Sequence, residues 1–317
     1  MKTLKTNAVI RIIIWSVVAL VLVGLLISGL SGDLRRSAES WGWYWGFNSS
    51  YANSSEYNVG NGSVGTQDIE YIDVYWEQGQ VNVETYGGTE IVFEETGNTS
   101  SDSRLIMRYH VEGDRLVIRF GDSGIRWTSF NSVEKTLNLK IPRTFTEYSG
   151  LAIETTSAAI AVNDVTVGGF VDTQSVSGKI DITDVNCESL SLESVSGSIN
   201  AENVTANTLA TENVSGSTKV AGAISNAYME SVSGSILLVT SEMIWHTSIE
   251  TISGSATLEL PENDGFNVDY SSISGGFTCD FETYAHEDGI KYKMGGAQIY
   301  METISGSMKI IKAGVKQ

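Results

Sequence analysis

One seven-residue phrase recurs eight times in the second half of the chain and constrains the fold more than any other feature. The copies are ETTSAAI (154–160), QSVSGKI (174–180), ESVSGSI (193–199), ENVSGST (212–218), ESVSGSI (230–236), ETISGSA (250–256), SSISGGF (271–277) and ETISGSM (302–308). Measured at the glycine, or at Ala158 in the first copy, the steps are 20, 19, 19, 18, 20, 21 and 31 residues. A regular step of this size indicates an array of one repeated structural unit.

Apolar residues alternate on both sides of the phrase, which predicts two short strands in each repeat. They follow the glycine at the second and fourth positions, as in Ile180 and Ile182, and precede it by seven and five, as in Leu190 and Leu192. Stacked repeats would lie about 4.8 Å apart and turn each position into a column. The sequence therefore predicts an all-β fold, a single-stranded β-solenoid or β-helix-like array of coils of roughly twenty residues.

The phrase itself is expected to form a corner of the coil. Its apolar residue breaks the period of two, which fits a bend or bulge, and we expect it to lie in the core. These residues are Val176, Val195, Val214, Val232, Ile252, Ile273 and Ile304. The glycine is expected to take a positive φ, and the preceding serine to bond nearby backbone groups. These glycines are Gly178, Gly197, Gly216, Gly234, Gly254, Gly275 and Gly306.

The repeats resemble the bacterial putative-adhesin family, an uncharacterised envelope domain with SGSI-type β repeats. The resemblance runs from Asp68 to the C-terminus and includes the segments 72–95, 139–160 and 258–277. It implies a β-repeat fold. It implies no catalytic residues, because the family has none established.

The N-terminal segment predicts a membrane anchor. Residues 1–11 are basic and form the expected cytoplasmic N-terminus, and 12–30 is a run of nineteen residues without a charge, long enough for a transmembrane helix. A cleaved signal peptide is the alternative. Residues 31–66 are expected to be a juxtamembrane linker rich in aromatic residues, Ser and Asn. Its aromatic residues at 41–47 would suit the membrane interface or a partner.

Beyond the linker, the sequence predicts two β regions. Residues 67–150 carry alternating strands and are expected to form an N-terminal cap or irregular first coils. Residues 151–317 are expected to form the regular coils, in chain order, with an inserted hairpin at 283–298 that accounts for the longest step.

The charge of the chain limits its partners. The formal net charge is −18, which argues against a nucleic-acid partner because phosphate binding needs a basic face. The cysteines, Cys187 and Cys279, form no metal motif and belong to coils several strand spacings apart, so no disulfide between them is expected.

One ionisable position repeats four residues before the glycine. It holds Glu154, Glu193, Glu212, Glu230, Glu250 and Glu302. Stacking would bring these carboxylates to about 5 Å, where a divalent cation could offset their repulsion. The simpler interpretation is a solvated acidic ridge without a cofactor.

No motif for catalysis or cofactor binding occurs in the chain. The sequence therefore predicts a single-pass protein of the cell membrane with an extracytoplasmic C-terminal domain. Its expected role is non-catalytic: surface interaction, adhesion or envelope-stress sensing, with the membrane, envelope proteins or surface glycans as partners. The alternative is a carbohydrate-active β-helix enzyme, a polysaccharide lyase or hydrolase, for which Lys179, Asp181 and Asp184 are the only clustered candidates.

Overall fold

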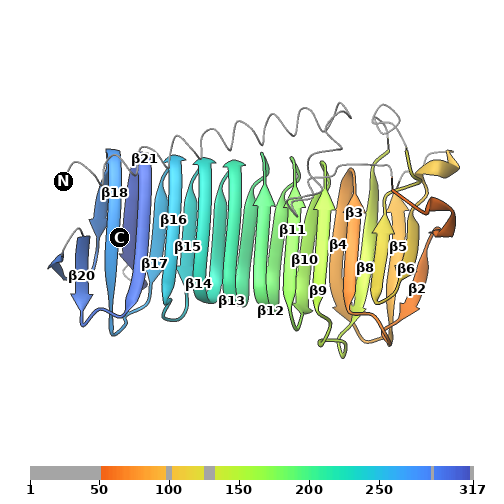
Figure 1. The fold of residues 1–317 in the computed structure, drawn as a ribbon, viewed down its shortest axis with the longest axis horizontal. Coiled ribbons are helices and arrows are strands. Elements are labelled where there is room, and N and C mark those ends of the chain that lie inside the picture. Colours follow the sequence, from red (N-terminus) through yellow and green to blue (C-terminus); the bar gives the residue numbers. More distant parts are fainter. Residues whose placement is uncertain (1–50, 98–101, 125–132, 287–288, 315–317) are drawn as a thin grey trace.

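The computed structural model describes residues 51–97, 102–124, 133–286 and 289–314, and the regular secondary structure in these ranges is almost entirely β-strand (Figure 1). The described residues also contain two short 3-10 turns, η1 (Ser54–Glu56) and η2 (Ser103–Leu105). Within these ranges no helix has the length and hydropathy needed to cross a bilayer. The predicted transmembrane segment 12–30, the preceding 1–11 and the linker residues 31–50, including the aromatic stretch 41–47, lie outside the described residues.

The strands form one long stack of coils, with the strands perpendicular to the stack (Figure 1). The central coils are built from β9 (Gly150–Thr155), β10 (Ala159–Thr166), β11 (Phe170–Ser175), β12 (Ile180–Ser194), β13 (Ile199–Ser215) and β14 (Thr218–Ser233). Successive coils pair in parallel, so that Leu190 lies beside Leu209 and Leu209 beside Ala227. The predicted all-β, solenoid-like fold is confirmed.

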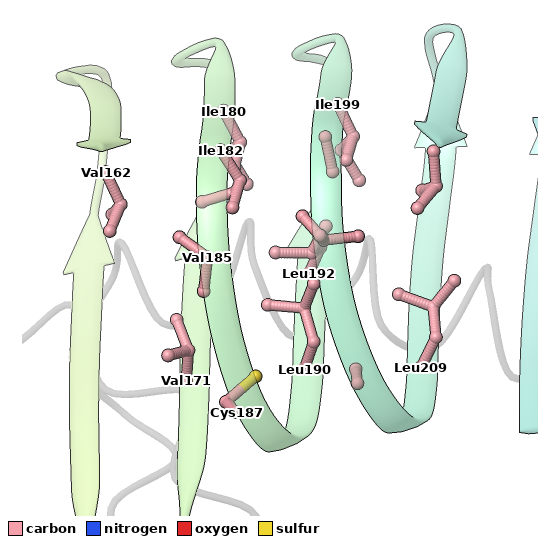
Figure 2. Packing of buried hydrophobic residues seen from close by; sticks show 14 of the residues in the cluster. Val162, Val171, Ile180, Ile182, Val185, Cys187, Leu190, Leu192, Ile199 and Leu209 are labelled. Atoms are coloured by element: carbon pink, nitrogen blue, oxygen red, sulfur yellow. The ribbon is translucent and has the colours of Figure 1, made fainter. Parts of the chain in front are cut away.

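The core runs along the inside of the coils and follows the predicted alternation. In Figure 2, Ile180 and Ile182 project inward from one part of a coil, and Leu190 and Leu192 from another. All four are fully buried. Burying one such side chain contributes about 1.5–3 kcal/mol, and a coil reaches this burial only when coils lie on either side of it.

The N-terminal end combines the stack with antiparallel strands. Its strands are β1 (Asn58–Val59), β2 (Gly62–Gly65), β3 (Tyr71–Trp76), β4 (Gly79–Tyr86), β5 (Glu90–Gly97), β6 (Arg108–Glu112), β7 (Arg115–Arg119) and β8 (Lys135–Pro142). β3 and β4 continue the stack, in parallel with β9 and β10 on one side and with β7 and β8 on the other. β5 and β6 add antiparallel strands, and the short β1 and β2 lie outermost.

The C-terminal coils do not follow chain order, which corrects the expectation. The strands are β15 (Ile236–Thr240), β16 (His246–Ser253), β17 (Ala256–Leu260), β18 (Gly265–Cys279), β19 (Thr283–His286), β20 (Gly289–Lys293) and β21 (Ala297–Lys312). β21 lies between β16 and β17 on one side and β18 on the other. β18 is thus the end strand of the stack, and β19 and β20 form an antiparallel hairpin on part of it. After this hairpin the chain returns as β21 and pairs with the inner edge of β18.

The apolar residues of the phrase do not lie in the core, contrary to prediction. Most are half-buried, and Ile273 is 58% exposed. The predicted core residues placed on the outside are Val176, Val195, Val214, Val232, Ile252, Ile273 and Ile304. The residue before each of these points inward instead. Ser175 is an example: it is buried, and the Oγ of Ser175 accepts a 2.8 Å hydrogen bond from the backbone N–H of Gly178. The alternation therefore continues one step further into the phrase, and a small polar side chain ends the strand.

The phrase glycines are required for a different reason from the one predicted. None of the seven has a positive φ. A Cβ on any of them would lie 1.8–2.4 Å from a carbonyl oxygen of the adjacent coil; for Gly178 that atom is the Ala158 oxygen, at 1.9 Å. Close approach of two backbones, rather than a left-handed turn, excludes a side chain here.

A second corner lies six residues after the phrase glycine, or after Ala158 in the first copy, in three successive coils. Asp164, Asp184 and Asn203 have φ of 55°, 53° and 55°, the left-handed region that Asp and Asn tolerate best among residues with a Cβ. The side-chain amide of Asn203 donates to the carboxylate of Asp184 across adjacent coils. These residues turn the chain between two walls of the coil.

Candidate functional site: an acidic face along the stack

The six repeated glutamates lie on one outer wall of the stack and are brought into a single column. From the N-terminal side, directly paired positions hold Tyr75, Glu154, Gln174, Glu193, Glu212, Glu230, Glu250, Glu302 and Ser271. We call its six glutamates the acidic column. Because β21 is inserted beside β16, Glu302 directly follows Glu250, and the last five glutamates are uninterrupted. Paired strands lie about 4.8 Å apart, so each of these five glutamates has another glutamate on the adjacent strand at roughly that spacing.

The acidic column is only partly exposed to solvent, unlike the ridge that the sequence suggested. Glu302 is 4% exposed and the others are half-buried. Burial, reinforced by neighbouring carboxylates, raises the pKa of Glu193 to about 8, and that of Glu154 and Glu230 to about 7. Burial also raises the pKa of Glu212. Near neutral pH several members of the column therefore carry a proton and can donate as well as accept hydrogen bonds.

Apolar and aromatic side chains flank the acidic column. Two residues further along each strand are the outward-pointing valines and isoleucines of the phrase, as Val232 is beside Glu230. Two residues before it, β14 carries the exposed Tyr228, and Tyr300 of β21 donates its hydroxyl to the carboxylate of Glu302. We call these neighbouring columns together the acidic face. The carboxyl groups and the valines and isoleucines repeat along it at the spacing of the strands, whereas the column that holds Tyr228 and Tyr300 varies from coil to coil.

At its N-terminal end the acidic face meets two arginines. The Arg119 guanidinium lies 4.1 Å from the ring centroid of Tyr75 and 4.5 Å from that of Tyr51. The Arg115 guanidinium forms an ion pair with the Asp73 carboxylate, with 2.6 Å between the nitrogen and the oxygen. The sequence analysis missed this end, although Arg115 and Arg119 flank the buried run of β7.

The acidic column does not assemble a metal site. Among the described residues, no three carboxylate, His or Cys side chains are grouped so as to hold an ion. The carboxylates form a single row, with one on each strand. An ion bound beside this row would reach only neighbouring carboxylates of the row, whereas Ca²⁺ takes six to eight oxygen ligands.

The residues considered for an enzyme have structural roles. Lys179 and Asp181 form an exposed ion pair at 2.7 Å. Asp184 is the left-handed corner residue bonded by Asn203. The two cysteines are free, with Cys187 buried on β12 and Cys279 at the end of β18. These groups do not converge on one point.

Residues 69–310 match a family model described as Toastrack DUF4097. The chain belongs to the Toastrack DUF4097 family. This match confirms the resemblance of its β repeats to an uncharacterised putative-adhesin family.

Two solved structures are similar to the Toastrack chain. A "putative cell adhesion protein" from Clostridium sporogenes ATCC 15579 is 12% identical, covers 81% of this chain and 99% of its own, and has a TM-score of 0.26. A "putative adhesin" from Bacteroides fragilis NCTC 9343 is 13% identical, covers 80% and 97%, and has a TM-score of 0.41. No curated protein matches the sequence.

The Toastrack fold also contains a buried ion pair that the sequence analysis missed. Lys135 is 1% exposed, and its Nζ lies 2.6 Å from the Glu95 carboxylate and donates to the carbonyl oxygens of Leu105 and Phe120. Burial lowers the pKa of Lys135 to about 8, and Glu95 opposes that shift. The alternation of β8 carries the signal, because Lys135 shares the inward face with Leu137 and Leu139. This cluster is part of the end of the core and is sealed from solvent.

The acidic column predicts that the Toastrack domain loses stability as the pH rises. Four of its glutamates, Glu154, Glu193, Glu212 and Glu230, have folded pKa values above the ordinary value of 4.5, so between about pH 4.5 and 8 the folded state binds more protons than the unfolded one. The stabilising contribution is full below pH 4.5 and is lost by about pH 8. Glu230→Gln removes one charge from the column, and we expect it to raise the free energy of unfolding at pH 8 by about 1–3 kcal/mol.

Urea unfolding at about pH 5.5 and pH 8 measures this effect. At pH 5.5 Glu230 is already protonated, so the variant and the natural chain should nearly coincide. Glu242→Gln, in an exposed turn, is the control and should change little at either pH. Equal destabilisation by Glu230→Gln at both pH values would show that its carboxyl is needed for a specific contact instead.

Proposed function

We propose that this Toastrack protein is a non-catalytic interaction protein of the cell surface, with a role in adhesion or envelope-stress sensing. The observation that carries the proposal is the acidic face. It extends over successive coils, repeats one arrangement of carboxyl and apolar groups, and leaves the remaining repeated positions to packing and corners. A solenoid with such a face binds extended partners along its length.

The chemistry of the face defines the class of partner. Carboxyl groups beside valine and isoleucine suit an envelope protein with basic and apolar side chains, or the hydroxyl groups of a surface glycan. A nucleic acid would be repelled by the charge of −18.

Anchoring by residues 12–30 would hold the domain outside the membrane. Protease added to intact cells with an opened wall should then digest the domain, and protection would contradict this orientation.

Neutralising the centre of the acidic face tests the proposal. In the full chain, Glu212, Glu230 and Glu250 are changed together to Gln, which keeps their size and polarity. The expected result is loss of partner capture on cells, measured by chemical crosslinking and by adhesion to isolated envelope glycans. Thermal unfolding should show that the variant remains folded.

A matched control separates a binding face from net charge. Glu188, Glu202 and Glu242 are exposed glutamates away from the column, and their joint change to Gln removes the same number of carboxyl groups and at least as much charge. Binding should survive it. Equal loss in both triple variants would leave only a general charge effect. Sustained glycan cleavage that disappears in Asp181→Asn would show an enzyme and contradict the proposal.

A further inference from the structure

The C-terminal end of the stack is covered over only half its length. β18 pairs with β21 along Phe266–Cys279, but with β20 only along Gly265–Asp269. In the described part of the chain, residues 270–279 therefore have a strand on one edge and none on the other. Figure 1 shows β18 and the β20 hairpin at this end of the stack.

The uncovered edge lacks the features that usually prevent an exposed strand edge from pairing with another strand. The stretch from Tyr270 to Cys279 reads YSSISGGFTC and contains no charge and no proline, in a chain whose net charge is −18. Soluble proteins commonly protect an edge with charges, proline or a covering segment. The charged cluster of Glu262, Lys293 and Lys312 lies beside this stretch and not within it: Lys293 belongs to β20, and the backbone N–H of Lys312 donates to Asp280, just after Cys279.

Apolar side chains are exposed at the same edge. Ile273 is 58% exposed and Tyr270 39% exposed, and the Tyr270 ring stacks on Phe277 with 4.1 Å between centroids. Ile252 and Ile304, which occupy the position of Ile273 in interior coils, are half-buried. Ile273 differs because no coil lies beyond it.

The structure restricts what can complete this edge within an assembly of the same chain. At the opposite end the outermost strands, β1 and β2, are only two and four residues long. Among the described residues these strands are too short to pair with all ten residues of β18, which disfavours a head-to-tail array. The matching edge is β18 of another copy. Two identical edges meet around a two-fold axis, which makes the pairing antiparallel.

We propose that two copies of this chain associate end to end through antiparallel pairing of residues 270–279 of β18. The pairing joins the open backbone groups of both edges and covers Ile273 and Tyr270. The ten paired residues are uncharged, and the carboxylates nearest to them are Asp269 and Asp280, which flank the stretch and come opposite each other at its two ends. This association meets the acidic face only at its C-terminal end, where Ser271 and Ile273 occupy the last positions of two of its columns, and it goes beyond the proposed function.

A charge placed on the edge tests the proposal. The full chain is purified in detergent, and its mass is measured by light scattering across a dilution series. The natural chain should be a dimer, and Ile273→Lys should be monomeric at concentrations where the dimer persists. Tyr228→Lys is the matched control, because it places the same charge on an exposed side chain of the interior strand β14 and should remain dimeric.

Crosslinking in native membranes provides a second readout that does not depend on the charged variant. In a Cys279→Ser background, Ser274→Cys lies at the centre of the edge and should form a disulfide-linked dimer on oxidation. Tyr228→Cys should not. A monomeric natural chain, or a dimer unaffected by Ile273→Lys, would overturn the proposal. A crosslink from position 274 to a different protein, or to another segment of the same chain, would also overturn it by identifying another occupant of the edge.

Discussion

Lys135→Met is expected to lower the free energy of unfolding by about 3–5 kcal/mol, because it leaves the buried Glu95 carboxylate without its partner. The lysine side chain is sealed inside the N-terminal end of the stack. Its Nζ also lies 4.0 Å from the ring centroid of Phe120 and 4.8 Å from that of Trp76. Methionine fills a similar volume but returns none of the three hydrogen bonds.

A second substitution distinguishes the lost charge partner from poor packing. Glu95 also accepts a 2.8 Å hydrogen bond from the backbone N–H of Met107, which a glutamine can still satisfy. We therefore expect Glu95→Gln to restore part of the stability when it is combined with Lys135→Met. Urea unfolding of the two single variants and the double variant gives the coupling between the residues.

The control for Lys135 is an ion pair with similar geometry on the surface. Lys179 is 2.7 Å from Asp181, and its side chain is 55% exposed. Lys179→Met should change the free energy of unfolding by no more than about 0.5 kcal/mol. If both lysine variants were equally mild, the cluster around Lys135 would contribute little net stability.

The sequence predicts the class of fold because the repeat and the alternation of apolar residues are local patterns with direct structural meaning. Leu190 and Leu192 lie where alternation places them. The order in which the C-terminal coils stack could not be predicted in this way. Every copy of the phrase pairs acceptably with every other, so no local pattern tells that β21 lies between β16 and β18.

The errors in the phrase have one physical origin. Hydrophobicity suggests that Val176 should be inside and Ser175 outside, yet the structure reverses them. Ser175 satisfies the N–H of Gly178 from inside the coil, a contact that depends on the three-dimensional path of the corner. The acidic column follows from register and was predictable, whereas its partial burial was not, because burial depends on the neighbouring columns of the assembled wall.

Gly254→Ala is expected to destabilise the stack by about 3 kcal/mol or more, the upper part of the range for overpacking a tightly packed site. The added Cβ would lie 1.8 Å from the Gly234 carbonyl oxygen and 2.8 Å from the carbon of the same carbonyl. Both atoms belong to the backbone of the adjacent coil, so the clash with the added Cβ can be relieved only if the two coils move apart. Separation would also disturb the pairing of β21 with β16.

The comparison with Gly65→Ala isolates this clash from the general effect of replacing a strand glycine. Gly65 lies in β2, its φ is not positive, and no atom lies within 4 Å of the position that a Cβ would take there. Its substitution should be neutral or slightly stabilising, because alanine lowers the entropy of the unfolded chain. Thermal unfolding of both variants measures the difference. If Gly254→Ala and Gly65→Ala melted together, close contact between coils at the phrase glycines would not be what excludes a side chain there.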